Sequence, residues 1–227
     1  MSVDLHHFAA LQEANAGYWF GPDGILHGER VVTSLIPENT TQPRIRPRSL
    51  ILHSNAGSSS ASWRNLWAWI TRPGDDGGEC HFDIDLTGAV AQFVSVHVRA
   101  DCNAKANSWL SPSGQRVGAV SIESADLGAA TLDVTGWNLD QLGGIIAIGT
   151  ALVVQEGIAC TSPTRWDDTG IGHHCQFPEW SIYKGKTCPG AQRIRQCDYV
   201  RGAVANRVAD YHARCDAAGV APVLGWW

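Results

Sequence analysis

The hydrophobic pattern of the chain predicts two buried strands. A short apolar run at positions 50–52 is typical of a buried strand over Ser49–His53. A second apolar run predicts another strand over Val117–Ile122, which ends at Glu123. His53 stands at the exit of the first strand and is followed by small and polar residues. Its side chain is therefore expected to project from the sheet into a cleft.

A hairpin is predicted between these two strands. The segment Cys80–Leu86 alternates, with His81, Asp83 and Asp85 on one side and Phe82, Ile84 and Leu86 on the other. A period of two with one polar side predicts a half-buried strand. Thr87-Gly88 supplies a turn into a second strand, which we place over Ala89–Val98.

Three helices are predicted from capping residues and from the 3.6-residue period. The serines at 58–62 supply N-cap chemistry for a helix over Trp63–Ile70. Asn138–Ile158 is apolar almost all round and predicts a buried helix. Ala191–Ala217 predicts an amphipathic helix, whose apolar side consists of Ile194, Tyr199, Val200, Val204, Val208 and Tyr211. The stretch Cys160–Trp180 is expected to be a long loop, and the mixture of elements favours an α/β fold with a mixed central sheet flanked by helices.

Length and composition limit the possible functions. A chain of 227 residues fits one domain, in which we expect an N-terminal arm (1–47), a core (48–217) and a short tail (218–227). The formal net charge of −5 argues against nucleic acid as the main partner. The basic cluster Arg44, Arg46 and Arg48, interleaved with prolines, is interpreted as a solvated linker.

The chain is expected to be made and folded in a reducing cytoplasm. Its N-terminus has neither the basic region nor the apolar region of a signal peptide. The apolar run Gly143–Val154 is too short to span a bilayer. Seven cysteines cannot all pair with one another, so most are expected to be thiols or metal ligands.

Soft metal ligands concentrate late in the chain. Gly172-His173-His174 is followed, after an aromatic loop, by Lys186-Thr187-Cys188-Pro189-Gly190. A catalytic zinc takes three such ligands and keeps one position open. His53 is a candidate for the third ligand. Ten tryptophans are many for this length, and a few of them are expected to line a groove for sugar rings or peptide.

Four segments resemble, in their order, the type 2 N-acetylmuramoyl-L-alanine amidases, whose fold is shared with the peptidoglycan recognition proteins. In chain order they are Leu50–His53; Glu79–Phe82 with Thr87–Gln92; Gly118–Glu123; and Gly172–His174 with Lys186–Gly190. The resemblance covers roughly residues 48–215. The second and third segments look most like endolysins of phages that infect actinobacterial hosts.

The resemblance implies one Zn²⁺ ion held by two histidines and one cysteine, with a water molecule in the fourth position. His53 would be the first ligand and Cys188 the last. Relatives with a Gly-His pattern would place the middle ligand at His173 of this chain. The phage pattern that ends at Phe177 would place it at His174, and we favour His174. The implied reaction is hydrolysis of the amide bond between N-acetylmuramic acid and the L-alanine of the stem peptide.

Further roles follow from the same resemblance. Lys186 would stabilise the oxyanion of the tetrahedral intermediate, and Glu79 would act as general base. Glu123 either orients a ligand histidine or forms a plain salt bridge. Asn107, in a polar loop with Asn103 and Lys105, and Trp63 are candidates for substrate contact.

The resemblance leaves rival functions open. A non-catalytic peptidoglycan-binding module is one alternative, although such relatives typically lose the ligand cysteine that this chain has at Cys188. A zinc peptidase that cuts within the stem peptide is another. We expect an endolysin-type enzyme without a separate wall-binding domain, acting as a monomer. It would accumulate in the host bacterial cytoplasm and reach the wall after the membrane is breached.

Overall fold

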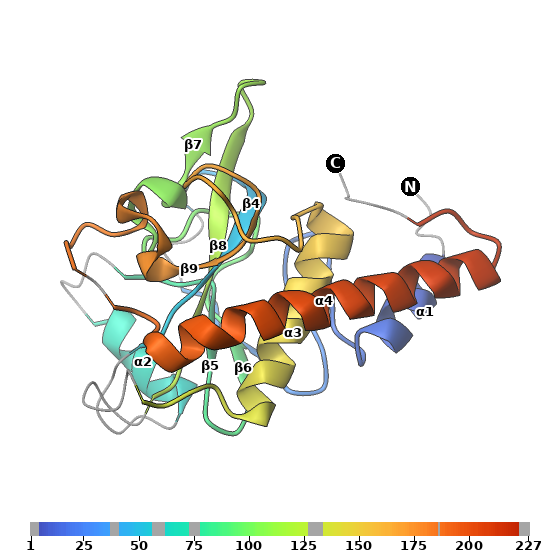
Figure 1. The fold of residues 1–227 in the computed structure, drawn as a ribbon, viewed down its shortest axis with the longest axis horizontal. Coiled ribbons are helices and arrows are strands. Elements are labelled where there is room, and N and C mark those ends of the chain that lie inside the picture. The colour runs from blue at the N-terminus through green and yellow to red at the C-terminus, as the bar shows by residue number, and fades with distance from the viewer. Residues whose placement is uncertain are drawn as a thin grey trace.

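The computed structural model describes residues 5–36, 41–55, 62–72, 78–126, 134–185 and 187–222, which fold into a mixed α/β structure (Figure 1). The helices are α1 (Leu5–Ala14), α2 (Trp63–Ile70), α3 (Leu139–Glu156) and α4 (Ala191–Ala217). Short 3-10 helices lie in the connections: η2 (Ala104–Asn107), η4 (His174–Gln176) and η5 (Pro178–Trp180).

A central sheet runs through the molecule. Its strands are β3 (Val31–Thr33), β4 (Arg46–Leu52), β5 (Phe82–Ile84), β6 (Val90–Gln92), β7 (Trp109–Leu110), β8 (Arg116–Ser124) and β9 (Gly170–His173). The order is β3-β6-β5-β8-β4-β9, with β7 paired to β8. Strands β5, β8, β4 and β9 are parallel, whereas β6 is antiparallel to β5. The carboxyl ends of β8, β4 and β9 therefore meet at one edge of the sheet.

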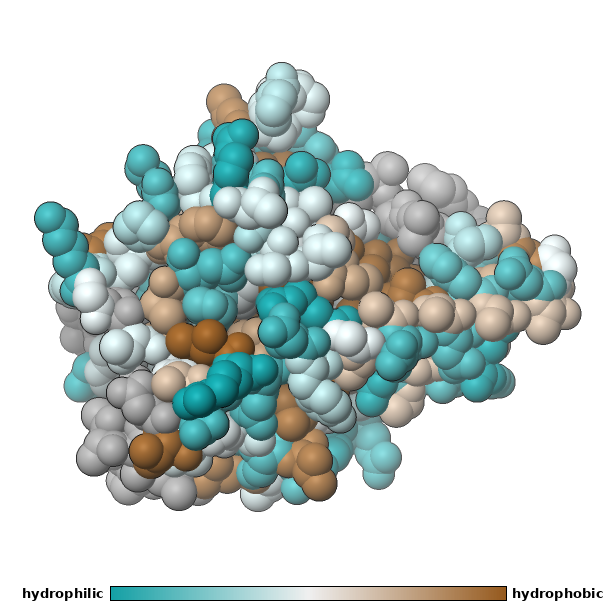
Figure 2. All heavy atoms as spheres, viewed as in Figure 1, coloured by the Kyte–Doolittle hydropathy of each residue, from teal (hydrophilic) through white to brown (hydrophobic). Residues whose placement is uncertain are grey.

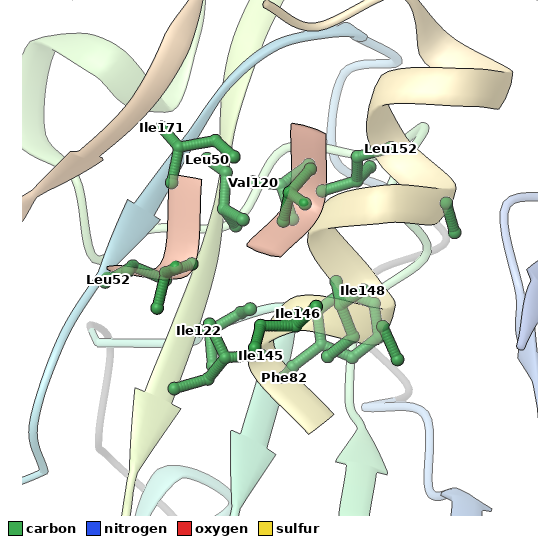
Figure 3. Close-up of a cluster of buried hydrophobic side chains, with 14 of the residues drawn as sticks. Leu50, Leu52, Phe82, Val120, Ile122, Ile145, Ile146, Ile148, Leu152 and Ile171 are labelled. Atoms are coloured by element: carbon green, nitrogen blue, oxygen red, sulfur yellow. The ribbon is translucent and has the colours of Figure 1, made fainter. Parts of the chain in front are cut away.

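Helices α3 and α4 cover one face of this sheet: α3 packs on β4 and β5 and against α4, and α4 also contacts β9 directly (Figure 1). Figure 3 shows the resulting core, which includes Leu50, Leu52, Phe82, Val120, Ile122, Ile145, Ile146, Ile148, Leu152 and Ile171. Burial of each such side chain contributes about 1.5–3 kcal/mol. The position of α3 between two layers explains its almost wholly apolar sequence.

The other face of the sheet is covered by the 3-10 helices with their loops and, over β5 and β6, by α2. Ile51 and Ala119 point to this side, where they pack against Ala106 of η2 and Trp180 of η5. The face of the molecule drawn in Figure 2 mixes hydrophilic and hydrophobic residues. Among the helices of the described residues, none is both long and apolar enough to cross a membrane.

Most of the predicted elements are confirmed. Helix α2 has the predicted bounds, and the Ser62 side chain accepts a hydrogen bond from the backbone N–H of Arg64. The earlier serines of the predicted cap lie outside the described residues. Helix α3 begins with a capping box between Asn138 and Gln141. The predicted hairpin corresponds to β5 and β6, although β6 ends at Gln92 and not at Val98.

Four expectations about elements were wrong. The strand β5 is buried on both faces rather than half-buried, because β6 and β8 flank it and both faces of the sheet are covered. The predicted loop 160–180 contains β9. Tyr199 is 58% exposed and does not belong to the apolar side of α4. The basic cluster is not a linker, since Arg46 and Arg48 belong to β4.

The segment predicted as an N-terminal arm, residues 1–47, contains a helix and several strands. Helix α1 packs against α4, and β1 (Trp19–Phe20) pairs with β2 (Leu26–His27). Strand β3 joins the edge of the main sheet beside β6. The division into arm, core and tail stays a prediction.

Candidate metal centre

Three candidate ligands converge at the carboxyl edge of the sheet. His53 directly follows β4, and His174 directly follows β9, which is the parallel neighbour of β4. Cys188 lies in the turn before α4. Ligand sites in α/β sheets typically form beyond the carboxyl ends of strands, and these three residues lie at such a position.

The ligand atoms of His53, His174 and Cys188 all lie within 4.8 Å of one another. The two imidazole ring centroids are 4.2 Å apart. All three residues are buried, with exposed fractions of 1%, 7% and 8% respectively.

Strand geometry separates His174 from His173. Side chains alternate along β9, so Ile171 and His173 share the face that carries the helices, whereas Gly172 faces the opposite side. Burial lowers the pKa of His173, and the charge of Arg201 on α4 lowers it further. The chain turns into η4 after β9, and this turn brings His174 to His53.

Hydrogen bonds orient both imidazoles. His174 Nε2 lies 2.9 Å from the backbone oxygen of Trp180, and His53 Nε2 lies 2.8 Å from Oδ1 of Asn103. A carbonyl oxygen only accepts, so each Nε2 donates a proton and the neutral ring presents its lone pair at Nδ1. Such oxygen partners are typical behind histidines that bind metals.

The thiol of Cys188 sits in a network of polar groups. The backbone N–H of Ser54 donates to Sγ of Cys188 at 3.2 Å, and the Ser54 hydroxyl donates to Asp126 at 3.0 Å. Asp126 in turn pairs with the buried Arg193 at 3.4 Å. Burial lowers the pKa of Arg193, whereas Asp126 raises it. The N–H of Ser54 and the nearby guanidinium both favour the negatively charged thiolate, which is the metal-binding form.

The donor set fits a zinc ion. Two imidazole nitrogens and one thiolate sulfur are ligands that zinc prefers, and three protein ligands leave a position open for catalysis. Bonds of about 2.1 Å to nitrogen and 2.3 Å to sulfur place ligand atoms up to about 4 Å apart. The observed separations require only a small movement to meet this distance.

Known structures provide an independent comparison. No protein-family model matches the sequence, and no curated protein matches it. The solved N-acetylmuramoyl-L-alanine amidase LysC from Clostridium intestinale is 14% identical, with a TM-score of 0.54 over 77% of this chain and 97% of that chain. The catalytic domain of XlyA is 17% identical, with a TM-score of 0.52 over 77% and 98% of the two chains.

This chain has the fold of the N-acetylmuramoyl-L-alanine amidases. Staphylococcus aureus hydrolase AmiA, solved in complex with its ligand, matches 97% of this chain and 96% of its own, with a TM-score of 0.50 and 10% identity. At identities this low the comparison supports the fold alone. Any amidase chemistry therefore has to be argued from the residues at the sheet edge.

A carboxylate lies beside the triad of this amidase fold. Glu123, next to the end of β8, has Oε1 3.5 Å from Nδ1 of His53. Its strand register pairs it with Asp83 on β5, so two acidic side chains are neighbours next to the triad. Glu79, the predicted base, is half-buried, and its backbone oxygen accepts a hydrogen bond from Asp101 at 2.9 Å.

The other residues predicted for this site lie in different environments. Lys186 lies outside the described residues. Trp63 is 8% exposed and packs against Phe93 in a hydrophobic cluster. Asn107 is buried, and its Oδ1 accepts from the backbone N–H of Asn103 at 2.6 Å, which holds the segment that contacts His53. The roles of all three in catalysis or substrate contact stay predictions.

His81 lies immediately before β5 and makes hydrogen bonds to the neighbouring backbone. Its Nδ1 accepts from the backbone N–H of Ser121 at 3.1 Å, and its Nε2 lies 3.0 Å from the Val98 oxygen. Burial lowers the pKa of His81 to about 4, although the bond to Val98 opposes this shift. The ring is therefore neutral, and its hydrogen bonds to Ser121 and Val98 hold neighbouring backbone segments together.

Several groups around the triad carried no signal in the sequence. The Trp180 oxygen and the Ser54 N–H are backbone groups, which every residue has, so only the fold can assign them a role. The buried pair of Asp126 and Arg193 joins residues from distant parts of the chain. Asn103 belonged to a recognisable polar loop, but its contact with His53 depends on packing between β4 and η2.

Proposed function

We propose that the protein is a zinc-dependent peptidoglycan hydrolase that cleaves the amide between N-acetylmuramic acid and the L-alanine of the stem peptide. The observation that carries this proposal is the cluster of His53, His174 and Cys188 at the carboxyl edge of an amidase-fold sheet. Structures that share this fold are named as N-acetylmuramoyl-L-alanine amidases.

Each residue of the cluster has a definite task. A zinc ion bound there would supply a Lewis acid that polarises the scissile carbonyl and acidifies a water molecule. His53 and His174 would hold it through Nδ1, since Asn103 and Trp180 accept from the opposite nitrogens. Cys188 would contribute a thiolate that the N–H of Ser54 stabilises.

Two carboxylates are candidates for the general base. Glu79 is the residue that the sequence resemblance implies. Glu123 is the second candidate, because its Oε1 lies 3.5 Å from a ligand histidine. A carboxylate in this position takes a proton from the attacking water and passes it to the leaving amine. Lys186 is proposed to stabilise the oxyanion that forms at the scissile carbonyl.

The biological setting follows from the proposed reaction. Two neighbours are named as endolysins, which supports a bacteriolytic role. We propose that this chain is an endolysin of a phage with an actinobacterial host, that it acts as a monomer, and that it reaches the wall from the host cytoplasm once the membrane is breached.

Digestion of purified peptidoglycan tests the proposal. New L-alanine amino termini with intact lactyl groups are expected, and both a chelator and Cys188→Ala should abolish them. New amino termini at a later residue of the stem peptide would assign a peptidase instead. Binding to peptidoglycan without any new termini, at a full complement of zinc, would assign a non-catalytic module. Full activity of Cys188→Ala would refute the metal site.

A further inference from the structure

The backbone N–H of Ser54 has an unusual acceptor at the edge of the sheet. The residues on either side of Ser54 donate their N–H groups to β8, at 2.8 and 3.1 Å. Alternate N–H groups of a strand point to opposite neighbours, so the N–H of Ser54 points to the side of β9. Strand β9 has already ended at His173, and Sγ of Cys188 accepts the hydrogen bond in place of a strand.

The side chain of Ser54 lies on the helix-covered face of the sheet. Side chains alternate along an extended chain, and Leu50 and Leu52 belong to the core of that face (Figure 3). Ser54 points to the same side, where its hydroxyl donates to Oδ2 of Asp126 at 3.0 Å. The same oxygen lies 3.4 Å from Nη1 of Arg193. The N–H that reaches the thiol and the hydroxyl that reaches Asp126 therefore belong to one residue.

Arg193 ties this arrangement to the start of α4. It is the third residue of α4 and comes five positions after Cys188. Its Nη2 donates to the backbone oxygen of Ala125 at 3.0 Å, and its Nη1 donates to the hydroxyl of Ser124 at 3.4 Å. The Ser124 hydroxyl in turn donates to the backbone oxygen of His53 at 2.6 Å. Arg193 therefore joins the turn that carries the thiol to the ends of β8 and β4.

Stability alone does not explain the buried ion pair of Asp126 and Arg193. Both side chains are 0% exposed. Moving two charges out of water is costly, and apolar residues of similar size often serve a core as well or better. The contact of 3.4 Å to one oxygen also lacks the two parallel hydrogen bonds of the strongest arginine–carboxylate pairs. What the pair does provide is a fixed acceptor for the Ser54 hydroxyl.

We propose that three residues, Ser54, Asp126 and Arg193, position the sulfur of the candidate zinc site. The proposal rests on the proposed function, because the atom that they position is one of the proposed zinc ligands. The contacts close a ring. The chain leads from Cys188 to Arg193, and the ion pair with Asp126 and the two hydrogen bonds of Ser54 lead back to the sulfur. Loss of any contact lets the sulfur move away from the two imidazoles, so zinc is bound more weakly.

Zinc affinity, measured in competition with a chelator, tests the proposal independently of catalysis. Ser54→Ala, Asp126→Asn and Arg193→Gln should each weaken zinc binding about 10- to 100-fold, as is typical of residues that orient metal ligands. Because they act through the same ring, the double variant of Ser54→Ala and Asp126→Asn should weaken binding by less than the product of the two single effects. Ser54→Thr keeps the hydroxyl and should bind zinc like wild type.

Two control variants match these changes. Ser49→Ala removes another buried hydroxyl on β4, one with no hydrogen-bond partner among the described residues. Arg207→Gln changes an arginine of α4 that donates to Asn15, about 21 Å along the helix from Arg193. Neither control should alter zinc affinity. The thiolate-to-metal charge-transfer band of the cobalt-loaded protein should shift in Ser54→Ala and keep its wild-type position in both controls.

Wild-type zinc affinity and an unshifted cobalt band in Ser54→Ala would overturn the proposal, even if thermal unfolding shows a loss of stability, because the role would then be structural only. Ser54→Ala decides the question by itself if the other variants fail to fold, since it leaves the ion pair intact. A wild type that binds zinc but produces no L-alanine termini would refute the proposed function, whereas the affinities would still decide the positioning role. A wild type that binds neither metal would overturn both proposals.

Discussion

Replacing Asp83 by asparagine should stabilise the protein increasingly as the pH rises. Asp83 is fully buried on β5, and among the described residues neither of its carboxylate oxygens has a hydrogen-bond partner. Burial is the largest cause that raises its pKa well above 3.8, followed by the charges of Glu123 and Asp85, although the nearby N–H of Ile84 opposes the shift. The folded protein therefore favours the protonated form of Asp83 more strongly than the unfolded chain does.

The magnitude follows from proton linkage. Because the pKa is raised in the folded state, the stability contributed by protonated Asp83 is fully present below pH 3.8 and is lost as the pH rises toward the folded pKa. The loss is about 1.4 kcal/mol per pH unit. Between pH 3.8 and 7 the loss is bounded at about 4.5 kcal/mol. An asparagine has nearly the same shape and does not ionise, so Asp83→Asn escapes this loss.

Urea unfolding of the metal-free protein between pH 4 and 8 measures the effect. Removal of metal matters because zinc binding itself depends on pH. The stability of Asp83→Asn relative to wild type should increase with pH by up to about 1.4 kcal/mol per unit. Asp216→Asn, at an exposed position on α4, makes the same change away from the core and is the matched control. A difference between Asp83→Asn and wild type that does not change with pH would refute the argument that burial favours protonated Asp83.

Three further predictions concern the metal centre. His174→Ala and Cys188→Ala should each reduce the bound zinc, measured by elemental analysis, from one ion to none. His173→Ala should retain the zinc ion, because His173 faces α4. Loss of zinc in His173→Ala alone would reverse the ligand assignment. Replacing the general base, either Glu79 or Glu123, by glutamine should lower kcat about 10²- to 10⁴-fold while zinc is retained. The same replacement at the other carboxylate should leave kcat unchanged. Gly172→Ala would place a methyl group 2.7 Å from the ring of Trp180, the residue whose backbone oxygen orients His174. It should therefore destabilise the protein by about 1–3 kcal/mol in urea unfolding and weaken zinc binding in competition with a chelator. Unchanged zinc affinity would show that Trp180 does not control that ligand.

Local patterns were sufficient for much of the fold. The apolar run at 50–52, the capping residues Ser62 and Asn138 and the long periodic segment of α4 each specify an element through neighbours in sequence. Such signals are local, and the structure contains these elements close to the predicted bounds. The half-buried character assigned to β5 failed because both faces of the sheet are covered, so Asp83 is buried as fully as its apolar neighbours Phe82 and Ile84.

Strand β9 shows why local patterns have a limit. Gly170–His173 contains a single large apolar residue, Ile171, and two glycines, so neither composition nor period predicts a strand. Its backbone becomes a strand only because β4 offers it a parallel edge from Ser49 to Leu52. That pairing also decides which of two adjacent histidines reaches His53.

The sequence by itself determined the chemical inventory of this protein: a histidine at a strand end, a histidine pair, a cysteine before the last helix, and an order of segments that resembles the amidases. Only the tertiary structure decided how these residues meet. Pairing of β4, β8 and β9 joins positions 121 apart, such as Leu52 and His173, and places Glu123 beside His53. The packing around these strands gives backbone groups of Ser54 and Trp180 their roles. The physical reason is that ligand identity is a property of side chains, whereas ligand geometry depends on long-range backbone hydrogen bonds that no local pattern encodes.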